Sequence, residues 1–156
     1  MWISQVVYET WMTRLRKTRT NSEKNSNNDQ QVKFLQIWVF PNKKNVQPRY
    51  DQKSISKEEK QNKLATVVSP IGTNDGGVQV HQDAWFHLST LDAGKELTYE
   101  VKKKDNGVYV FVLEGDLKIG EIELSRRDGL GISESNSFII HANATSEILL
   151  MEVPMM

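Results

Sequence analysis

The sequence predicts an all-β domain of the sandwich or jelly-roll type, preceded by a short N-terminal helix. From residue 64 onward, turn signals rich in Gly, Asn and Asp recur about every 8–12 residues, a spacing typical of such folds. The runs between these turns are rich in Val, Ile, Leu and Phe, and several of them alternate apolar with polar side chains. Alternation buries one face of each strand, so two sheets are expected to face each other across a common core.

The length and composition fit a single domain that needs no disulfide bonds. The chain has 156 residues, which is enough for a hydrophobic core of its own. It contains no cysteine, which excludes a disulfide framework, a zinc–thiolate site and a thiol nucleophile. A cysteine-free chain fits a reducing compartment, and we expect a cytoplasmic protein. Twenty basic residues balance twenty acidic ones, so we expect neither nucleic acid nor a membrane as partner.

Residues 1–31 are expected to form an N-terminal helix and a polar linker. An apolar side chain recurs at every fourth position between residues 2 and 16, at Ile3, Val7, Trp11 and Leu15. We expect this helix either to pack on the domain or to fray from it. The basic cluster from Arg14 to Arg19 leaves open an organelle presequence, or a membrane or nucleic-acid surface as its target.

About nine strands and at most two short helices are expected in order along the chain. The expected strands are 32–40, 64–70, 78–81, 83–91, 96–104, 108–115, 117–124, 137–142 and 147–153. The first is too apolar for one-sided alternation, so we expect it to be covered on both faces. Ser54 or Ser56 is placed to cap a helical turn through Glu58 and Glu59. Among the turns, Asn106-Gly107 suits a type I′ hairpin, Gly120 a bulge, and Gly129 with Gly131 another turn.

The residue types that carry catalysis are sparse. His81, His87 and His141 do not form a His-x-His pair, and we expect all three to be structural. His81 and His87 can meet only if Gln82-Asp83 bends the chain. No serine occupies a nucleophile elbow, and no glycine-rich segment forms a phosphate loop. Glu121 and Glu123 are read as a solvated strand face, and Lys102–Lys104 as an exposed hairpin end.

Several segments taken together resemble the C-terminal half of the pirin family. They are FLQIWVFPNKKNVQPRYDQ (34–52), LATVVSP, DGG, VQVHQDA, DGLGISE and IIHANATSEILLMEVP, and their order and spacing match that half over roughly residues 32–154. The resemblance implies one cupin-like domain, a double-stranded β-helix or jelly-roll sandwich. In the family two cupins stand in tandem, and the first holds iron or another divalent metal through three histidines and a glutamate. Bacterial members are associated with quercetin dioxygenase activity, and animal members with transcriptional cofactor roles.

The chain departs from the family pattern at the metal site. It has no His-Pro-His motif, and Asn21-Ser22-Glu23 stands where the resemblance implies His-Ser-Glu. Glu23 is therefore the remnant candidate ligand, and one carboxylate cannot hold a transition metal where imidazoles supply most of the affinity. We expect no intact metal site, no catalytic residue and no cofactor in this chain.

Three units and two functional hypotheses follow from the sequence. The units are 1–31, a strand and connector at 32–52, and a pirin-like cupin domain at 53–156. The first hypothesis is a truncated or diverged pirin-like member without catalytic activity, acting as an interaction or structural module. The alternative is a quercetinase-type iron dioxygenase that needs a partner chain or unrecognised ligands. The ligands for its metal would come jointly from Glu23, His81, His87 or His141, or from a partner chain that carries the missing cupin.

The segment 32–40 also predicts a partner. Its apolar side chains, Phe34, Ile37, Trp38 and Phe40, belong in the resemblance with the first cupin and here need another cover. Exposed apolar strands promote association. We therefore expect either the N-terminal helix to lie over them, or a homodimer or protein partner to bind them.

Overall fold

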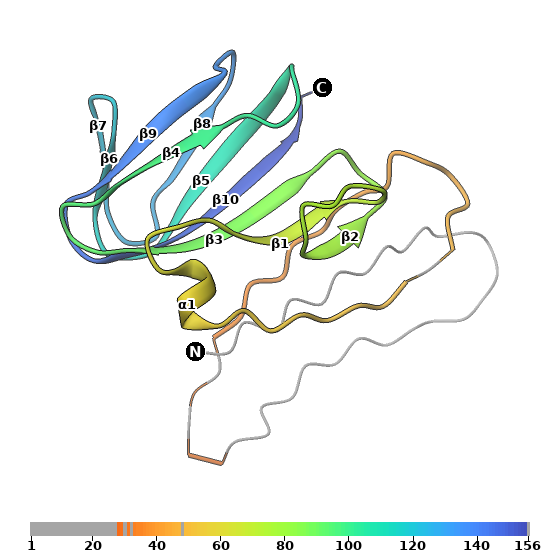
Figure 1. Cartoon of the computed structure of the whole chain (residues 1–156), viewed down its shortest axis with the longest axis horizontal. Helices are drawn as coiled ribbons and strands as arrows, with labels where there is room; N and C mark the ends of the chain where they lie inside the picture. The colour runs from red at the N-terminus through yellow and green to blue at the C-terminus, as the bar shows by residue number, and fades with distance from the viewer. Residues whose placement is uncertain (1–27, 30, 32, 48, 156) are drawn as a thin grey trace.

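The fold is a two-sheet β-sandwich in a computed structural model that describes residues 28–29, 31, 33–47 and 49–155 (Figure 1). The expected helix at 2–16, the basic cluster and Glu23 lie outside the described residues. No helix in the described part of the chain is long and apolar enough to cross a membrane.

Ten strands and one short helix make up the described elements. In chain order they are α1 (Lys57–Lys60), β1 (Ala65–Pro70), β2 (Val78–Val80), β3 (Trp85–Leu91), β4 (Glu96–Glu100), β5 (Asn106–Glu114), β6 (Leu117–Ile119), β7 (Ile122–Leu124), β8 (Gly129–Ile132), β9 (Ser137–Ala142) and β10 (Ser146–Pro154). One sheet has the order β2-β1-β3-β10-β5-β8 and the other the order β4-β9-β6-β7. All strand pairs are antiparallel except β1 with β2. The all-β sandwich predicted from the sequence is confirmed.

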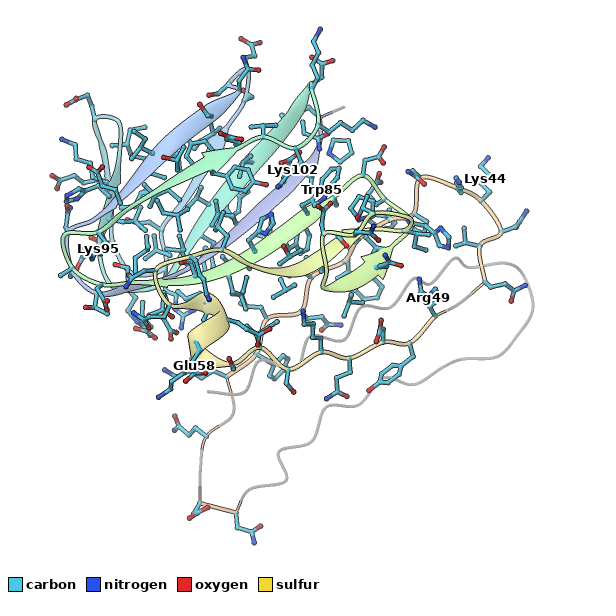
Figure 2. All side chains as sticks on the ribbon, viewed as in Figure 1. Lys44, Arg49, Glu58, Trp85, Lys95 and Lys102 are labelled. Atoms are coloured by element: carbon cyan, nitrogen blue, oxygen red, sulfur yellow. The ribbon has the colours of Figure 1, made fainter. Side chains whose placement is uncertain are left out.

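The main core lies between the two sheets. In β5, Val108, Val110 and Val112 point into it, and in β10, Ile148 and Leu150 do the same. These side chains are essentially inaccessible to solvent, because two-residue periodicity places alternate residues on one face. Figure 2 shows side chains filling the space between the sheets, whereas the chain around Lys44 and Arg49 extends away from the sandwich.

A second apolar cluster lies on the other face of the six-stranded sheet. It includes Phe86 and Leu88 of β3 and Leu149 of β10, which alternate with the residues that face the main core. Ile37 and Val39 pack against this cluster from the segment before the first strand. Figure 1 shows that segment running alongside the six-stranded sheet, on the side away from the four-stranded sheet.

The prediction of a strand at 32–40 is therefore wrong for the described residues 33–40. Residues 33–40 are not assigned to a strand and pair with none of the ten strands. The predicted cover on both faces is also wrong. Ile37 and Val39 are half-buried, whereas Phe34, Trp38 and Phe40 are exposed.

Three predicted turns differ from the observed ones. The connection before β5 bends at Asp105 (φ 67°), while Asn106 and Gly107 already belong to the strand. A type I′ hairpin is absent there because β4 pairs with β9 and β5 with β10 and β8, so the connection passes from one sheet to the other. Gly120 begins a two-residue hairpin turn between β6 and β7 rather than a bulge. The predicted turn at 129–131 is strand β8, which pairs with β5.

The helix cap, in contrast, is confirmed. Ser56 is the N-cap of α1, and its Oγ accepts a hydrogen bond from the Glu59 backbone N–H at 3.3 Å. Glu59 Oε2 accepts one from the Ser56 N–H at 2.7 Å, which completes a capping box. The box explains why a single helical turn forms at this place in a polar segment.

Candidate functional site

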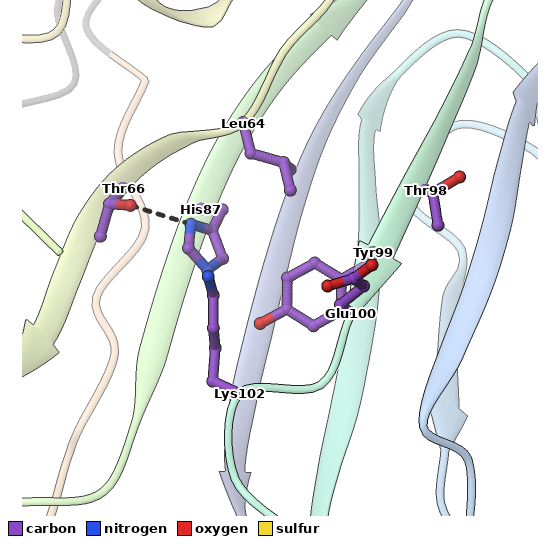
Figure 3. Close-up of a pocket in the computed structure, with 7 residues that line it drawn as sticks. All are labelled: Leu64, Thr66, His87, Thr98, Tyr99, Glu100 and Lys102. Atoms are coloured by element: carbon purple, nitrogen blue, oxygen red, sulfur yellow. Dashed lines mark hydrogen bonds between the residues drawn. The ribbon is translucent and has the colours of Figure 1, made fainter.

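A pocket of about 270 Å³ opens between the six-stranded sheet and β4. We call it the His87 pocket. Its lining residues come from β1 and the residue before it, from β3, and from β4 and the turn that follows; they are Leu64, Thr66, His87, Thr98, Tyr99, Glu100 and Lys102. In Figure 3 the rings of His87 and Tyr99 lie next to each other in the lining of the pocket. The ring centroids are 5.4 Å apart with an edge-on angle of 61°.

His87 is the buried polar group of this pocket, with only 3% of its surface exposed. Its Nδ1 lies 3.2 Å from Thr66 Oγ1, and its Nε2 has no hydrogen-bond partner in the described part of the chain. Burial first, and the positive charge of Lys102 second, lower the pKa of His87 to about 4. The imidazole is therefore neutral at pH 7, and one ring nitrogen is left for another partner. The prediction of a satisfied structural histidine is wrong for Nε2.

Beside the pocket, Glu152 anchors the turn that carries Lys102. Glu152 lies in β10 and is fully buried. Its Oε2 accepts hydrogen bonds from Tyr99 Oη–H at 2.7 Å and from the Lys102 N–H at 2.8 Å. Its Oε1 accepts from the Lys103 N–H at 2.9 Å and from Asn106 Nδ2–H at 2.8 Å. Four donors on one carboxylate fix the 101–106 connection against the sheet.

The same contacts determine the state of Tyr99. Burial first, and its hydrogen bond to Glu152 second, raise the pKa of the Tyr99 hydroxyl. The phenol therefore stays protonated and acts as a donor to Glu152 rather than as an acid or base toward the pocket.

Lys102 and Glu100 both belong to the pocket lining, but only the charge of Lys102 acts on His87. Both side chains are exposed, and neither forms an ion pair within the described residues. Lys102 acts electrostatically on both His87 and Asp75. In Figure 3 its side chain extends toward the ring of His87, and Glu100 extends from the β4 side. The predicted exposure of Lys102 is confirmed. Lys102 lines a pocket, however, and the connection that carries it is not the end of a hairpin.

The other two histidines lie apart from this pocket. His81 follows β2, where its carbonyl oxygen accepts a hydrogen bond from the Asn42 N–H at 2.7 Å. His141 lies in β9 between Ile140 and Ala142, which both face the core, so its ring points to the opposite side of the sheet. Its Nδ1 is 3.2 Å from Asn143 Oδ1. The structure therefore does not bring the three histidines together.

The donor set does not fit the metal site that the family resemblance implies. Within the described residues, no three side chains of His, Cys, Asp or Glu lie close enough to hold a metal ion. Glu152 uses its carboxylate oxygens for four protein donors, and His87 is the histidine that lines the pocket. A site of three imidazoles and a carboxylate cannot be assembled from these groups.

Sequence reasoning missed Glu152 and Tyr99. A signal for Glu152 is present, since it follows Ile148 and Leu150 at the same inward parity in an apolar strand. A lone carboxylate at an inward position needs internal donors, because a buried unpaired charge is costly.

The sheet order and the enclosed core define a cupin-type β-sandwich. A model of the family described as the quercetinase C-terminal cupin domain matches residues 66–153. This is more than half of the chain, and the chain belongs to that family, in agreement with the pirin resemblance of its sequence.

Two similar proteins are from bacteria. Quercetin 2,3-dioxygenase of Escherichia coli K12 is 28% identical over 134 residues, which cover 86% of this chain and 56% of that protein. A pirin-like protein of Caulobacter vibrioides is 26% identical over 121 residues, covering 78% and 52%. The chain thus spans about half the length of the curated relatives that it matches.

Solved structures agree. The crystal structure of YhhW from Escherichia coli has a TM-score of 0.68 at 28% identity, covering 76% of this chain and 49% of that one. The structure of bacterial pirin YhhW in complex with nickel(II) gives the same values.

Proposed function

We propose that this chain is a pirin-type cupin module that acts through association, with a second copy of itself as the partner, and not through metal-dependent oxidation. The observation that carries the proposal is an apolar strip made of Phe34, Trp38 and Phe40. Their exposed fractions are 56%, 67% and 71%. Ile37 and Val39 lie between them and pack inward, so the segment has an apolar side on the sandwich and a second apolar side in solvent.

The size of the strip supports an interface. Three aromatic side chains with about 200 Å² each, about two-thirds exposed, offer about 400 Å² per copy. This is about half of the roughly 800 Å² per partner in a standard interface. Leu35, which is also exposed, follows Phe34 in the chain and extends the surface. Aromatic residues in the centre of a patch are the type that contributes most to binding.

The relatives support a second cupin as the partner. The match to the Escherichia coli dioxygenase covers 134 of 156 residues, and a stretch of that length cannot avoid residues 33–40. The strip therefore belongs to a part of the chain shared with proteins about twice as long. Two copies of this chain would restore a pair of cupins, and each would cover the strip of the other.

Sedimentation equilibrium of the purified chain at tens of micromolar tests this association. We expect twice the mass of the chain for the wild type, and the mass of one chain for the double variant Trp38→Ser/Phe40→Ser. The matched control is Ile122→Ser/Ile139→Ser, which removes exposed apolar side chains from the four-stranded sheet and should leave the dimer intact. A wild-type chain that sediments as a monomer would refute the proposal.

Metal content tests the second half of the proposal. After incubation with ferrous iron and desalting, we expect much less than one metal per chain by plasma mass spectrometry.

The absence of cysteine supports the cytoplasm as the compartment in which the module works.

A quercetin dioxygenase is the second candidate function, favoured by the name of the 28% identical Escherichia coli relative. One metal per chain or per dimer, together with loss of the quercetin absorbance band, would establish it and overturn the non-catalytic assignment. Glu23, His81, His87 and His141 would then be the first residues to replace.

A further inference from the structure

We propose that the His87 pocket binds a small carboxylic acid that carries a hydrogen-bond donor group, such as a hydroxy acid. In this complex Lys102 holds the carboxylate at the rim, and His87 Nε2 forms a hydrogen bond with the hydroxyl group deeper in the pocket.

The first support is the free nitrogen of His87. Buried polar atoms in folded proteins nearly always have a partner, and Nε2 has none within the described residues although His87 is more than nine-tenths buried. When Thr66 Oγ1–H donates to Nδ1, Nε2 carries the ring proton and donates to a ligand oxygen. In the other tautomer, Nε2 accepts from a ligand hydroxyl. A hydroxy acid offers a partner to either form.

The second support is the positive charge at the rim. Lys102 forms no ion pair within the described residues, and an unpaired lysine at the mouth of a pocket attracts an anion. The ammonium group of Lys102 extends from a turn that Glu152 fixes through the Lys102 backbone N–H. A fixed base for the side chain reduces the ordering cost of binding.

The size of the pocket limits the ligand. About 270 Å³ corresponds to about nine water molecules at roughly 30 Å³ each. Leu64 and the ring of Tyr99 supply an apolar wall for a short carbon chain. Hydroxy acids of three or four carbons meet both conditions.

The pocket is independent of the apolar strip. His87 points to the inner side of the six-stranded sheet, while its neighbours Phe86 and Leu88 point to the outer side, where Ile37 packs. Failure of dimerisation therefore leaves the ligand proposal untouched, and the reverse also holds.

Histidine-selective ¹³C/¹⁵N labelling gives a direct readout, because the chain has only three histidines. L-lactate is titrated to about 50 mM at pH 7 and constant ionic strength, and the ring resonances are followed by NMR. We expect saturable shifts at His87, with His81 and His141 unchanged as internal controls. Lactamide, which lacks the charge, and propionate, which lacks the hydroxyl, should each bind up to about fivefold more weakly, the effect of losing one exposed charged or polar contact.

Two lysine variants separate a site from general attraction. Lys102→Gln should weaken lactate binding up to about fivefold, whereas Lys104→Gln changes a neighbouring exposed lysine outside the pocket lining and should leave binding unchanged. No shift at His87, equal shifts at all three histidines, or equal losses in both variants would each overturn the proposal.

Discussion

Glu152→Gln tests the buried carboxylate that joins β10 to the 101–106 connection. Glutamine has nearly the same shape, but it replaces one acceptor oxygen by an NH₂ group. Whichever way the amide turns, this NH₂ faces two donors. Either Tyr99 Oη–H and the Lys102 N–H, or the Lys103 N–H and Asn106 Nδ2–H, lose their acceptor.

The expected cost is about 3 kcal/mol of unfolding free energy. Each hydrogen bond to a charged group contributes about 1.5–3 kcal/mol, two such bonds are lost and two become neutral. Removal of a buried charge also relieves its desolvation, which offsets part of this loss. Breaking one side of a buried charged network typically costs about 3–5 kcal/mol, and the conservative shape of glutamine places the variant at the lower end.

Urea denaturation followed by circular dichroism measures the effect. With a slope of about 1–3 kcal/mol per molar urea, the midpoint should fall by about 1–3 M. Glu121→Gln is the matched control, since its side chain is 98% exposed, and it should change the free energy by less than about 0.5 kcal/mol. A loss below about 1 kcal/mol at Glu152 would show that the four contacts do not hold the turn. Tyr99→Phe removes one hydrogen bond to the buried carboxylate, so it should cost about 1.5–3 kcal/mol and combine non-additively with Glu152→Gln.

Two further predictions concern the inner histidine and a backbone turn. The native pKa of His87, about 4, is below its ordinary value of 6.5, so the unfolded chain binds more protons between these pH values and stability falls as pH decreases. Relative to His87→Gln, the wild type should lose about 2–3 kcal/mol between pH 7.5 and 4.5 in urea melts, and a pH-independent difference would contradict this. Gly115→Ala should destabilise by about 2 kcal/mol or more, because φ is 90° and a Cβ would meet the Thr145 carbonyl oxygen. Gly94→Ala has a similar φ of 76° with open space and should cost only about 1 kcal/mol in the same assay.

The strands that could be predicted from the sequence are those in which successive side chains face two different environments, one on each side of the sheet. In β10, Ile148 and Leu150 face the main core and Leu149 faces the second cluster, so the pattern itself specifies an extended strand covered on both sides. Segment 33–40 has a similar apolar content, yet it forms no strand pair. A high apolar content indicates that a segment will be buried. A strand also needs a neighbouring strand for its backbone hydrogen bonds, and the local sequence does not specify that neighbour.

Glycine was the other source of error. The predicted turn at Gly129 and Gly131 is strand β8, and a Cβ at Gly129 would run into the ring of Tyr109 on the neighbouring strand. Here glycine makes room for a side chain rather than for a positive φ. A single sequence does not distinguish these two uses, because both leave the same letter between apolar residues.

The candidate site was only partly predictable for a related reason. His87 stood out as a titratable residue, but its significance depends on a missing partner at Nε2 and on Lys102 across the pocket. Both arise from long-range packing: β3 and β4 belong to different sheets, and Glu152 of β10 positions the turn between β4 and β5. Such a convergence from three separate strands has no local pattern in the sequence.

The six-stranded sheet explains why this cupin presents two separate surfaces. Its strands are apolar on both faces, so both faces need cover, and the four-stranded sheet covers only the inner one. The segment with Ile37 and Val39 covers part of the outer face, and an extended chain that turns alternate residues inward must turn the others outward. Those others are Phe34, Trp38 and Phe40. The segment that covers the outer face of the sheet therefore exposes an apolar surface of its own to solvent. On the inner face, valine and isoleucine side chains pack in the core between the sheets, and the pocket opens beside His87. The strip and the pocket therefore follow from one requirement, the two-sided burial of a single sheet, although opposite faces of that sheet carry them.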